Sequence, residues 1–332
     1  MVDVAAIAQG AQVGAEATPG TAAAAGTILD SISITTGFPG QNDTFRPDGH
    51  KYPSLTLPGK EWMSAAYDGK LTYSDFVYIL SSAIRWTTPA NTGSTGKVWT
   101  VAPQNAAEDT HLTFTVEKGG SVRAHRFAYG MFSSINIDVT RDECNISGEM
   151  FGRRIEDGVT LTATPTAVEL DPVLPRNFSV FLDTTAAGLG TTRLLRTFQG
   201  QINLGNLVAP VWPINALVPS FDTHVEVEPQ QSVVMFVEHD AAGAEFITLL
   251  RSGDTRFLRL SATGEAAFEA GTPGIFKSWI FDGAVKVKSI GDHEDREGIY
   301  GYSVTLDLVN DDDWGKPYEF TVTNRIATIV GA

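Results

Sequence analysis

The sequence predicts a mainly β protein made of two similar modules in tandem, each a β-sandwich or open barrel with one short flanking α-helix. Two observations lead to this prediction. Most patterned segments alternate apolar and polar residues, which is the period of a half-buried strand. In addition, three segments of the first half recur in the same order in the second half.

The internal repeat aligns three pairs of segments. TAAAAGTILDSISITTG, from Thr21, aligns with TTRLLRTFQGQINLGNL, from Thr191, at an offset of about 170 residues. YSDFVYILSS, from Tyr73, aligns with GAEFITLLRS at the same offset. At a slightly shorter offset, RFAYGMFSSINIDVTRDECNISGEM aligns with WIFDGAVKVKSIGDHEDREGIYGYSVTL. Two similar modules in one chain are a natural way to build a pseudo-symmetric ring.

The chain divides into an arm and two modules. Residues 1–25 are rich in Ala, Gly and Thr, and predict an extended N-terminal arm with too little apolar surface to fold alone. The stretch Leu170–Arg176 carries two prolines and is the best candidate for a domain boundary. We therefore expect the first module over 26–172 and the second over 173–332.

In the first module, Ile28–Thr36 alternates with Ile32 and Ile34 on one face, which predicts a strand. The stretch Gly37–Pro58 is dense in Gly, Pro, Asn and Asp, and predicts a long loop or irregular hairpin with a role of its own. Helical spacing predicts a short amphipathic helix over Tyr73–Ile84. Further strands are predicted at His111–Glu117, Val122–Phe127, Ile135–Val139, Cys144–Phe151 and Val159–Thr164.

The second module repeats this scheme, with its short helix at Glu245–Leu250. Within the predicted strand His224–Glu228, alternation places Val225 and Val227 inward and the polar residues outward. The other strands are predicted at Phe178–Asp183, Phe198–Leu204, Phe257–Leu260, Trp279–Val287, Tyr300–Val309 and Phe320–Thr328.

Composition argues against several functional classes. With 39 acidic and 24 basic residues the net charge is −15, the opposite of the balance that grips nucleic acid. The single cysteine, Cys144, excludes an internal disulfide framework and a cysteine-rich zinc site. The N-terminus lacks a basic, apolar signal sequence and no window has the length of a membrane helix, so we expect a protein kept in the cytoplasm.

Catalytic and metal-binding signatures are lacking in the sequence. It contains no GxSxG, P-loop or HExxH motif, and its six histidines do not pair at metal-ligand spacing. The acidic clusters Asp292–Asp295 and Asp311–Asp313 lack the frame of a calcium loop, so we expect solvated turn charges there. The sequence therefore predicts neither an enzyme nor a cofactor or metal site.

Four segments carry a resemblance to a known family. They are GAEATPGT from Gly14, then DGKLTYSDFVYIL, RDECNISGEMFGR and SIGDHEDREGIYGYSVTLDLVND. In this order they resemble the opening Gly-x-Glu-x-Thr-x-Gly-Thr phrase, the loop-and-helix segment, the later strand pair and the closing hairpin of the tail tube proteins (major tail proteins) of long-tailed, siphovirus-type bacteriophages. Ala17 departs from the pattern, because Thr or Ser is commoner there.

The resemblance implies a structural virion protein. In that family the sheets of neighbouring modules join around a ring into an inner β-barrel, and rings stack into a hollow tube through which DNA leaves the capsid. A two-module chain is expected to form trimeric, pseudo-sixfold rings rather than hexamers. The implied partners are further copies of the chain, the tape measure protein, and the tail terminator and distal tail proteins. DNA would pass through the lumen without specific binding, no membrane would be involved, and the tail would assemble in the host bacterial cytoplasm.

The same resemblance assigns two sets of residues. A negatively charged lumen repels phosphate within a Debye length of about 8 Å, and the candidate acids are on the polar side of predicted strands: Asp138, Glu226, Glu228 and Asp307. The arm and the long loop are expected to bridge subunits and rings through Glu16, Thr18, Pro19, Gly20, Thr21, Phe45, Arg46, His50 and Tyr52.

Two other functions compete with the tail tube. Another self-assembling β module, such as a capsid decoration protein or a secretion-type tube protein, would share the composition, but a decoration protein needs no lumen. A β-sandwich enzyme acting on carbohydrate would need paired carboxylates across a cleft and exposed aromatic platforms. The six tryptophans are instead dispersed along the chain, which favours core or interface positions.

Overall fold

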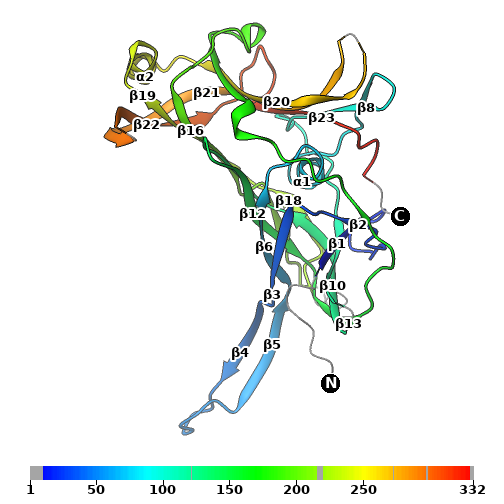
Figure 1. The fold of residues 1–332 in the computed structure, drawn as a ribbon. Coiled ribbons are helices and arrows are strands. Elements are labelled where there is room, and N and C mark those ends of the chain that lie inside the picture. The colour runs from blue at the N-terminus through cyan, green and yellow to red at the C-terminus, as the bar shows by residue number, and fades with distance from the viewer. Residues whose placement is uncertain (1–9, 121, 215–219, 272, 297, 330–332) are drawn as a thin grey trace.

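The computed structural model describes residues 10–120, 122–214, 220–271, 273–296 and 298–329. Strands dominate these residues, and two α-helices, α1 (Phe76–Ala83) and α2 (Ala241–Ser252), pack against the sheets (Figure 1). The prediction of a mainly β fold is therefore confirmed. Two single-turn 3-10 helices follow the middle of the chain, at Pro175–Asn177 and Ala186–Gly188.

A central sheet runs through both halves of the chain, and its neighbouring strands are all antiparallel. The pairing of β11 with β16 joins the four strands from the first half to the four from the second half. Its eight strands follow in the order β3 (Ile32–Gly37), β6 (Met63–Lys70), β12 (Cys144–Gly152), β11 (Ile135–Val139), β16 (Thr197–Gly205), β19 (Gln230–Glu238), β22 (Ile299–Leu308) and β21 (Ile275–Arg296).

Alternation gives this sheet one apolar and one polar face, because successive side chains of a strand point to opposite sides. Residues in register across the strands keep the same character. One buried row contains Ile146, Ile137, Ile202, Val233 and Leu306. The adjacent row on the other face is polar on every strand: Ser33, Asp68, Ser147, Asn136, Asn203, Ser232, Asp307 and Lys286.

Outer strands complete each half. In the first half they follow the order β1 (Gly10–Ala15), β9 (Phe114–Gly119), β10 (Ala124–Phe132) and β13 (Glu156–Val159), and β1 also pairs with β2 (Thr27–Ile28), which pairs with β14 (Thr166–Ala167). In the second half they are β15 (Phe178–Asp183), β20 (Arg256–Glu269), the first part of β21, β23 (Tyr318–Asn324), β8 (Gly96–Val101) and β7 (Ala90–Thr92).

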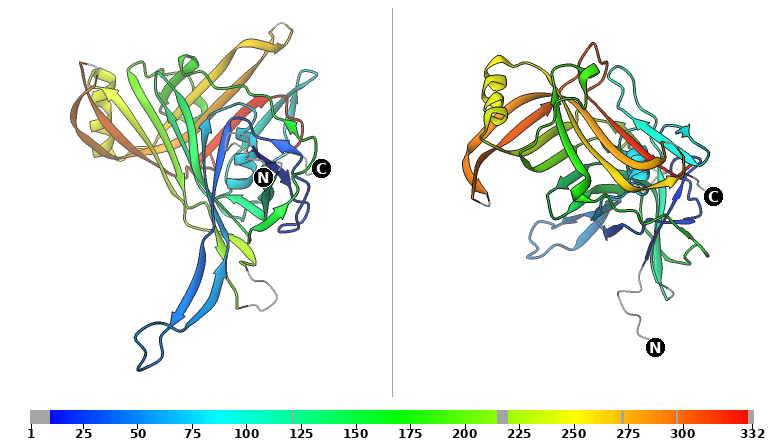
Figure 2. Two further views of the ribbon diagram at one scale, coloured as in Figure 1. Left: turned by 60° about the horizontal axis from the view of Figure 1, so that its bottom comes forward. Right: turned by 45° about the horizontal axis from the view of Figure 1, so that its top comes forward.

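Two hairpins leave the central sheet at the same point in the strand order of each half. The hairpin of β4 (Gly40–Phe45) and β5 (Leu55–Glu61) connects β3 to β6 and projects away from the body (Figures 1 and 2). The hairpin of β17 (Val208–Val211) and β18 (Thr223–Glu226) connects β16 to β19 and instead packs against the first half through Phe221. The sequence predicts either a long loop or an irregular hairpin over Gly37–Pro58, and the structure contains a hairpin there.

The two halves share one hydrophobic core. The helix predicted over Tyr73–Ile84 is present as α1, but it is buried on every side rather than amphipathic. Its Phe76 packs against Trp279 and Phe320 of the second half. Strand β8 of the first half also pairs with β23. The proposed boundary at Leu170–Arg176 does not separate two cores, because Asp171 lies against Ser74 and forms an ion pair with Lys277.

Several predicted elements differ in extent, and two of the differences have a clear local cause. Helix α2 begins four residues earlier than expected, because the Asp240 carboxylate caps it by accepting from Gly243 N at 2.8 Å. The predicted strand Val159–Thr164 is wrong apart from Val159, since Thr162 bonds to Glu117 through its backbone amide and hydroxyl. Strands β1, β6, β7, β8, β14, β17 and β19 were not predicted.

The shared core predicts that the chain unfolds as one unit. Phe76→Ala removes a ring that both halves contact, so we expect a single transition with the free energy of unfolding lowered by about 3–5 kcal/mol. Calorimetry and urea titration followed by tryptophan fluorescence measure this, with the exposed Phe45→Ala as the control. Two separate transitions in the unmutated protein would contradict a shared core.

Candidate functional site

The polar face of the central sheet is the most extensive candidate surface. Asp138 and Asp307 lie on it: Asp138 accepts from Gln199 Nε2 at 3.0 Å, and Asp307 pairs with Lys288 at 3.0 Å. Asp68 and Glu149 share this face but were missed, although MSAAYDGK in β6 alternates clearly. The face is therefore rich in amides and hydroxyls, with carboxylates partly balanced by lysines.

The other two candidate acids lie elsewhere. Glu226 is turned toward the first half, because β18 presents His224 and Glu226 inward and leaves Val225 exposed, so the predicted facing of this strand is wrong. Glu228 is exposed beyond the end of β18 and belongs to no strand. Neither residue lies on the polar face of the central sheet.

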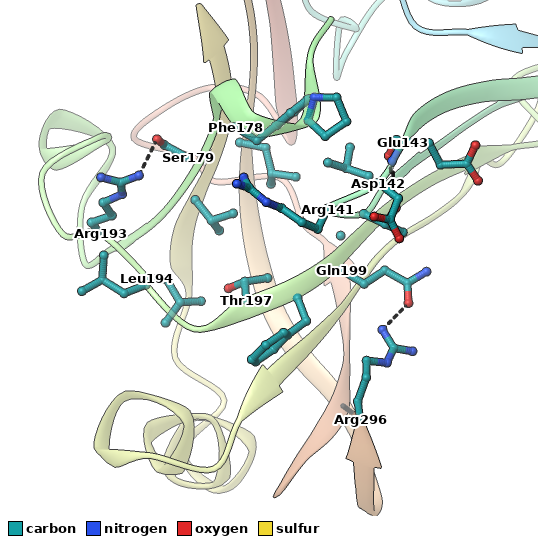
Figure 3. Close-up of a pocket in the computed structure, with 18 residues that line it drawn as sticks. Arg141, Asp142, Glu143, Phe178, Ser179, Arg193, Leu194, Thr197, Gln199 and Arg296 are labelled. Carbon is teal, nitrogen blue, oxygen red and sulfur yellow. Dashed lines mark hydrogen bonds between the residues drawn. The ribbon is translucent and has the colours of Figure 1, made fainter. Parts of the chain in front are cut away.

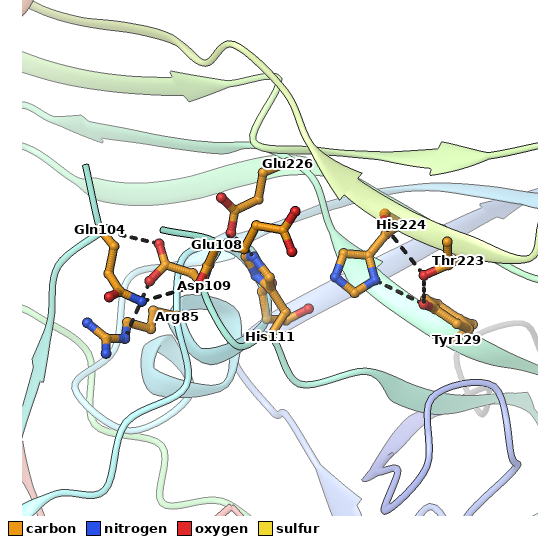
Figure 4. Close-up of polar contacts among 10 residues, drawn as sticks. Arg85, Gln104, Glu108, Asp109, His111, Tyr129, Thr223, His224 and Glu226 are labelled. Carbon is orange, nitrogen blue, oxygen red and sulfur yellow. Dashed lines mark hydrogen bonds and ion pairs between the residues drawn. The ribbon is translucent and has the colours of Figure 1, made fainter. Parts of the chain in front are cut away.

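A buried polar network explains this reversed facing (Figure 4). His111 lies with its side chain 3% exposed between Ser82 O, 2.8 Å from Nδ1, and Glu226 Oε1, 2.9 Å from Nε2. The Ser82 carbonyl and the Glu226 carboxylate thus hold the His111 ring from both sides. Glu226 also accepts from Asp109 N at 2.7 Å. The network ties the β17–β18 hairpin to the first half.

The same network continues to Tyr129. The Tyr129 hydroxyl lies 2.9 Å from His224 Nδ1, and the His111 and His224 rings meet edge to face at 5.4 Å. Burial lowers the pKa of His224, the neighbouring His111 lowers it further, and Glu226 opposes both. The neutral form of His224 is thus favoured, and its Nδ1 shares a hydrogen bond with the Tyr129 hydroxyl.

The predicted arm residues are part of the folded body from Gly10 onward, and residues 1–9 lie outside the described part of the chain. The expectation of an extended arm over 1–25 is therefore wrong from Gly10, because β1 pairs with β9 along its length. Glu16 is buried, and each of its carboxylate oxygens accepts two hydrogen bonds. The four donors are Gly20 N, Thr113 Oγ1, Thr115 Oγ1 and Tyr129 N, at 2.7–2.9 Å.

The rest of the Gly-x-Glu-x-Thr-x-Gly-Thr phrase forms a tight turn around this carboxylate. Thr21 N donates to Thr18 O at 3.0 Å, with Pro19 between them. Gly20 has φ +79°, and a Cβ there would lie 2.2 Å from the Arg153 guanidinium. These contacts give the phrase a folding role within the chain, while Thr18, Pro19 and Thr21 stay exposed, so their expected bridging role remains a prediction.

The predicted loop residues lie at the end of the projecting β4–β5 hairpin. Phe45 and Tyr52 are 55% and 68% exposed, and Arg46 Nη1 donates to His50 O at 2.9 Å to close the tip. Exposed apolar side chains gathered on a projecting element are typical of an interaction surface. Leu55 and Leu57 of β5 extend it.

Both edges of the central sheet lack a strand partner among the described residues. Strand β3 pairs only with β6, and β21 from Lys286 to Arg296 pairs only with β22. An unpaired edge presents backbone donors and acceptors that can bind another strand. The Lys118 ammonium donates to Ile34 O and covers one carbonyl of the β3 edge.

A cavity of about 770 Å³ lies where the β11–β12 turn meets β15 and the start of β16 (Figure 3). Part of its wall is apolar, with Phe178, Val180 and Leu260, and the rest is polar or charged. Arg141, Arg193 and Arg296 also line it, and no carboxylate of the described residues lies within ion-pair distance of these three side chains. Sequence reasoning missed this cavity, because its arginines are far apart in the chain.

Comparison with known proteins adds no assignment: no family model matches the chain, and no curated protein matches it. In the described part of the chain, no group of three or more potential metal ligands comes together. No α-helix among the described residues is long and apolar enough to cross a membrane.

The burial of Glu16 predicts a large effect on stability. Glu16→Ala leaves four buried donors without their acceptor, so we expect the free energy of unfolding to fall by at least about 3 kcal/mol. Urea titration followed by circular dichroism measures it. Glu108→Ala, at an exposed carboxylate, is the control. Equal stability of the two variants would contradict the stabilising role of the Glu16 carboxylate.

The network around His224 predicts a pH dependence. Because the pKa of His224 is lowered below its ordinary value of 6.5, the unfolded chain binds the proton more readily, and stability falls as the pH drops below about 6.5. His224→Gln should flatten this part of the stability profile, while the hairpin-tip variant His50→Gln should not. Urea titrations between about pH 5 and pH 8 give the profiles, and parallel profiles for all three proteins would contradict the assignment.

Proposed function

We propose that this protein is a structural subunit of the tail-tube type, whose copies close into rings that stack as a hollow conduit for DNA. The observation that carries the proposal is the central sheet. It is continuous over eight strands, has one polar face, and has an unpaired edge on each side. The backbone donors and acceptors at the edges of such a sheet find partners when the edges pair with further copies, as strands do in a closed barrel.

The strand pairings support the duplicated module. In the first half, β1 pairs with β9, β9 with β10, β10 with β13, β3 with β6, β6 with β12, and β12 with β11. The second half has the corresponding pairings of β15 with β20, β20 with β21, β21 with β23, β16 with β19, β19 with β22, and β22 with β21. Helices α1 and α2 occupy the same place in the two series.

The junction inside the chain supplies a template for the junction between chains. Strand β16 corresponds to β3, and β11 corresponds to the second part of β21. The internal junction sets Asn136 opposite Asn203. When the paired residues are followed across each half of the sheet, Lys286 holds the position of Asn136, and Ser33 holds the position of Asn203. The proposal therefore places Lys286 of one copy opposite Ser33 of the next, and three copies with six modules favour a trimer over a hexamer.

In such a ring the polar face would line the lumen, because helices and outer strands cover the apolar face. Asp68, Asp138, Glu149 and Asp307 would face the passing DNA, and their charges would disfavour binding of phosphate. The tape measure, tail terminator and distal tail proteins are the expected partners of the assembled tube in the virion. This conduit role requires no catalysis and no cofactor.

Disulfide trapping tests the proposed ring. In the variant Ser33→Cys with Lys286→Cys, facing residues of adjacent strands come within the Cα separation of about 4.4–6.8 Å that a disulfide spans. After oxidation we expect covalent dimers and trimers on a denaturing gel, and nothing larger, because the ring closes at three. Electron microscopy of concentrated protein should show hollow tubes with threefold rings of six lobes.

Ser33→Cys alone is the matched control and should give no ladder. A ladder that ends at six chains would keep the tube and reject the trimeric ring. Monomers alone, with no tubes at high concentration, would overturn the proposed function.

A further inference from the structure

We propose that the arginine-lined cavity receives the acidic turn Asp311–Trp314 of a second copy of this chain, and that this contact joins copies head to tail. The inference rests on the proposed tube, because it names the surfaces that stack one ring on the next. The cavity combines a concave apolar wall with three guanidinium groups that lack a carboxylate partner among the described residues. Three arginines against the two turn acids Asp142 and Glu143 leave the cavity lining with an excess of positive charge, in a chain whose net charge is −15, and this excess favours an acidic occupant.

The cations of the cavity are arranged around its apolar wall (Figure 3). Arg193 Nη2 donates to Ser179 Oγ at 3.1 Å, and Arg296 Nη1 donates to Gln199 Oε1 at 2.7 Å, so neutral partners hold both side chains in place. Arg141 reaches into the space from the exposed β11–β12 turn. Of the two acids on that turn, Glu143 is paired with Lys70 at 2.9 Å, which leaves Asp142 as the acid that offsets the three arginines.

The turn after β22 has the complementary chemistry. Asp312 and Asp313 are exposed, and no cation lies within ion-pair distance of either carboxylate in the described residues. Asp311 Oδ1 accepts from Trp314 N at 2.8 Å, which fixes the turn. Trp314 follows the acids as an apolar group, half-buried with its ring edge-on to Phe257 at 5.9 Å. Asp312 Oδ1 accepts from the neutral Asn310 Nδ2, at 3.1 Å. Two carboxylates without a cationic partner, beside an aromatic ring, match a cavity of guanidinium groups and apolar side chains.

The topology of the central sheet favours an intermolecular contact. The cavity lies beside the turn that follows β11, whereas the acidic turn follows β22. Three antiparallel steps separate β11 from β22, so the two turns leave the sheet at opposite ends. A contact between different surfaces on two copies is heterologous, and repetition of it extends an assembly without limit. This is the kind of contact that a stack of rings requires.

The projecting β4–β5 hairpin is the other element that could reach a neighbour, but its charge fits the cavity poorly. Its tip, Arg46–Ser54, carries Arg46 and Lys51 against a single acid, Asp48. Insertion of this tip would place cations against arginines, which is unfavourable in a partly dehydrated cavity. The acidic turn is therefore the occupant that the charges select.

Charge reversal on each surface, followed by mixing, tests the contact. Variant one carries Arg141→Glu with Arg193→Glu, and variant two carries Asp312→Lys with Asp313→Lys. Each places like charges at the contact, so we expect the concentration needed for polymerisation to rise at least about tenfold, while ring formation is kept. In an equal mixture, a polymer in which the two variants alternate brings the glutamates of variant one against the lysines of variant two. It also brings the arginines of variant two against the aspartates of variant one. Polymerisation should therefore return toward that of the unmutated protein.

Sedimentation velocity and electron microscopy measure rings and polymers separately, and Arg251→Glu and Asp254→Lys are matched controls on exposed positions elsewhere. Polymerisation of either variant at the unmutated concentration, or failure of the mixture to recover, overturns the inference. Loss in variant one alone would assign the cavity to another segment, such as the hairpin, and also overturns it. Unmutated protein that forms open head-to-tail chains without rings would reject the tube but keep this contact, and protein that stays monomeric would reject both.

Discussion

The structure depends on the backbone pairing of β11 with β16. This pairing makes one sheet of two halves, and its register decides which side chains share a face. Ile137 lies opposite Ile202 and Asp138 opposite Gln201, so the apolar and the polar rows both continue across the junction. A slip by one residue would set Ile137 on the face of Gln201 and expose half of the core. The polar face and the shared core around α1 follow from this single register.

The strands of the central sheet were predictable where one face is wet, because alternation is then visible in the sequence. Ile135–Val139 and Cys144–Phe151 are examples. Helix α1 was recognised, but its complete burial was not, since its surroundings come from Trp279 and Phe320, far away in the chain. The alternation in β18 was read with the wrong facing, because His111 and Tyr129 recruit its polar residues inward. Long-range polar contacts of this kind leave no pattern in the local sequence.

The candidate site residues likewise divide into those that the sequence predicts and those that it does not. The hairpin tip could be anticipated from its glycines and prolines, and Asp138 and Asp307 from strand alternation. The role of Glu16 could not, because a charged residue in a small, polar segment predicts exposure. In the structure, four donors from three separate segments surround it. The buried Glu16 carboxylate therefore joins the end of β1 to β9 and β10, in addition to the backbone pairing of β1 with β9.

The two hairpins occupy equivalent positions but differ in fate. The β17–β18 hairpin is held by Phe221 and the histidine network, whereas the β4–β5 hairpin leaves the body with its aromatic residues exposed. In the proposed ring, three chains would carry three projecting hairpins, although the inner wall would be built from six modules. The wall alone would let one ring sit on the next in six rotational settings. The hairpins would reduce these to three, so the angular step between successive rings would be set by the part of the chain in which the two halves differ.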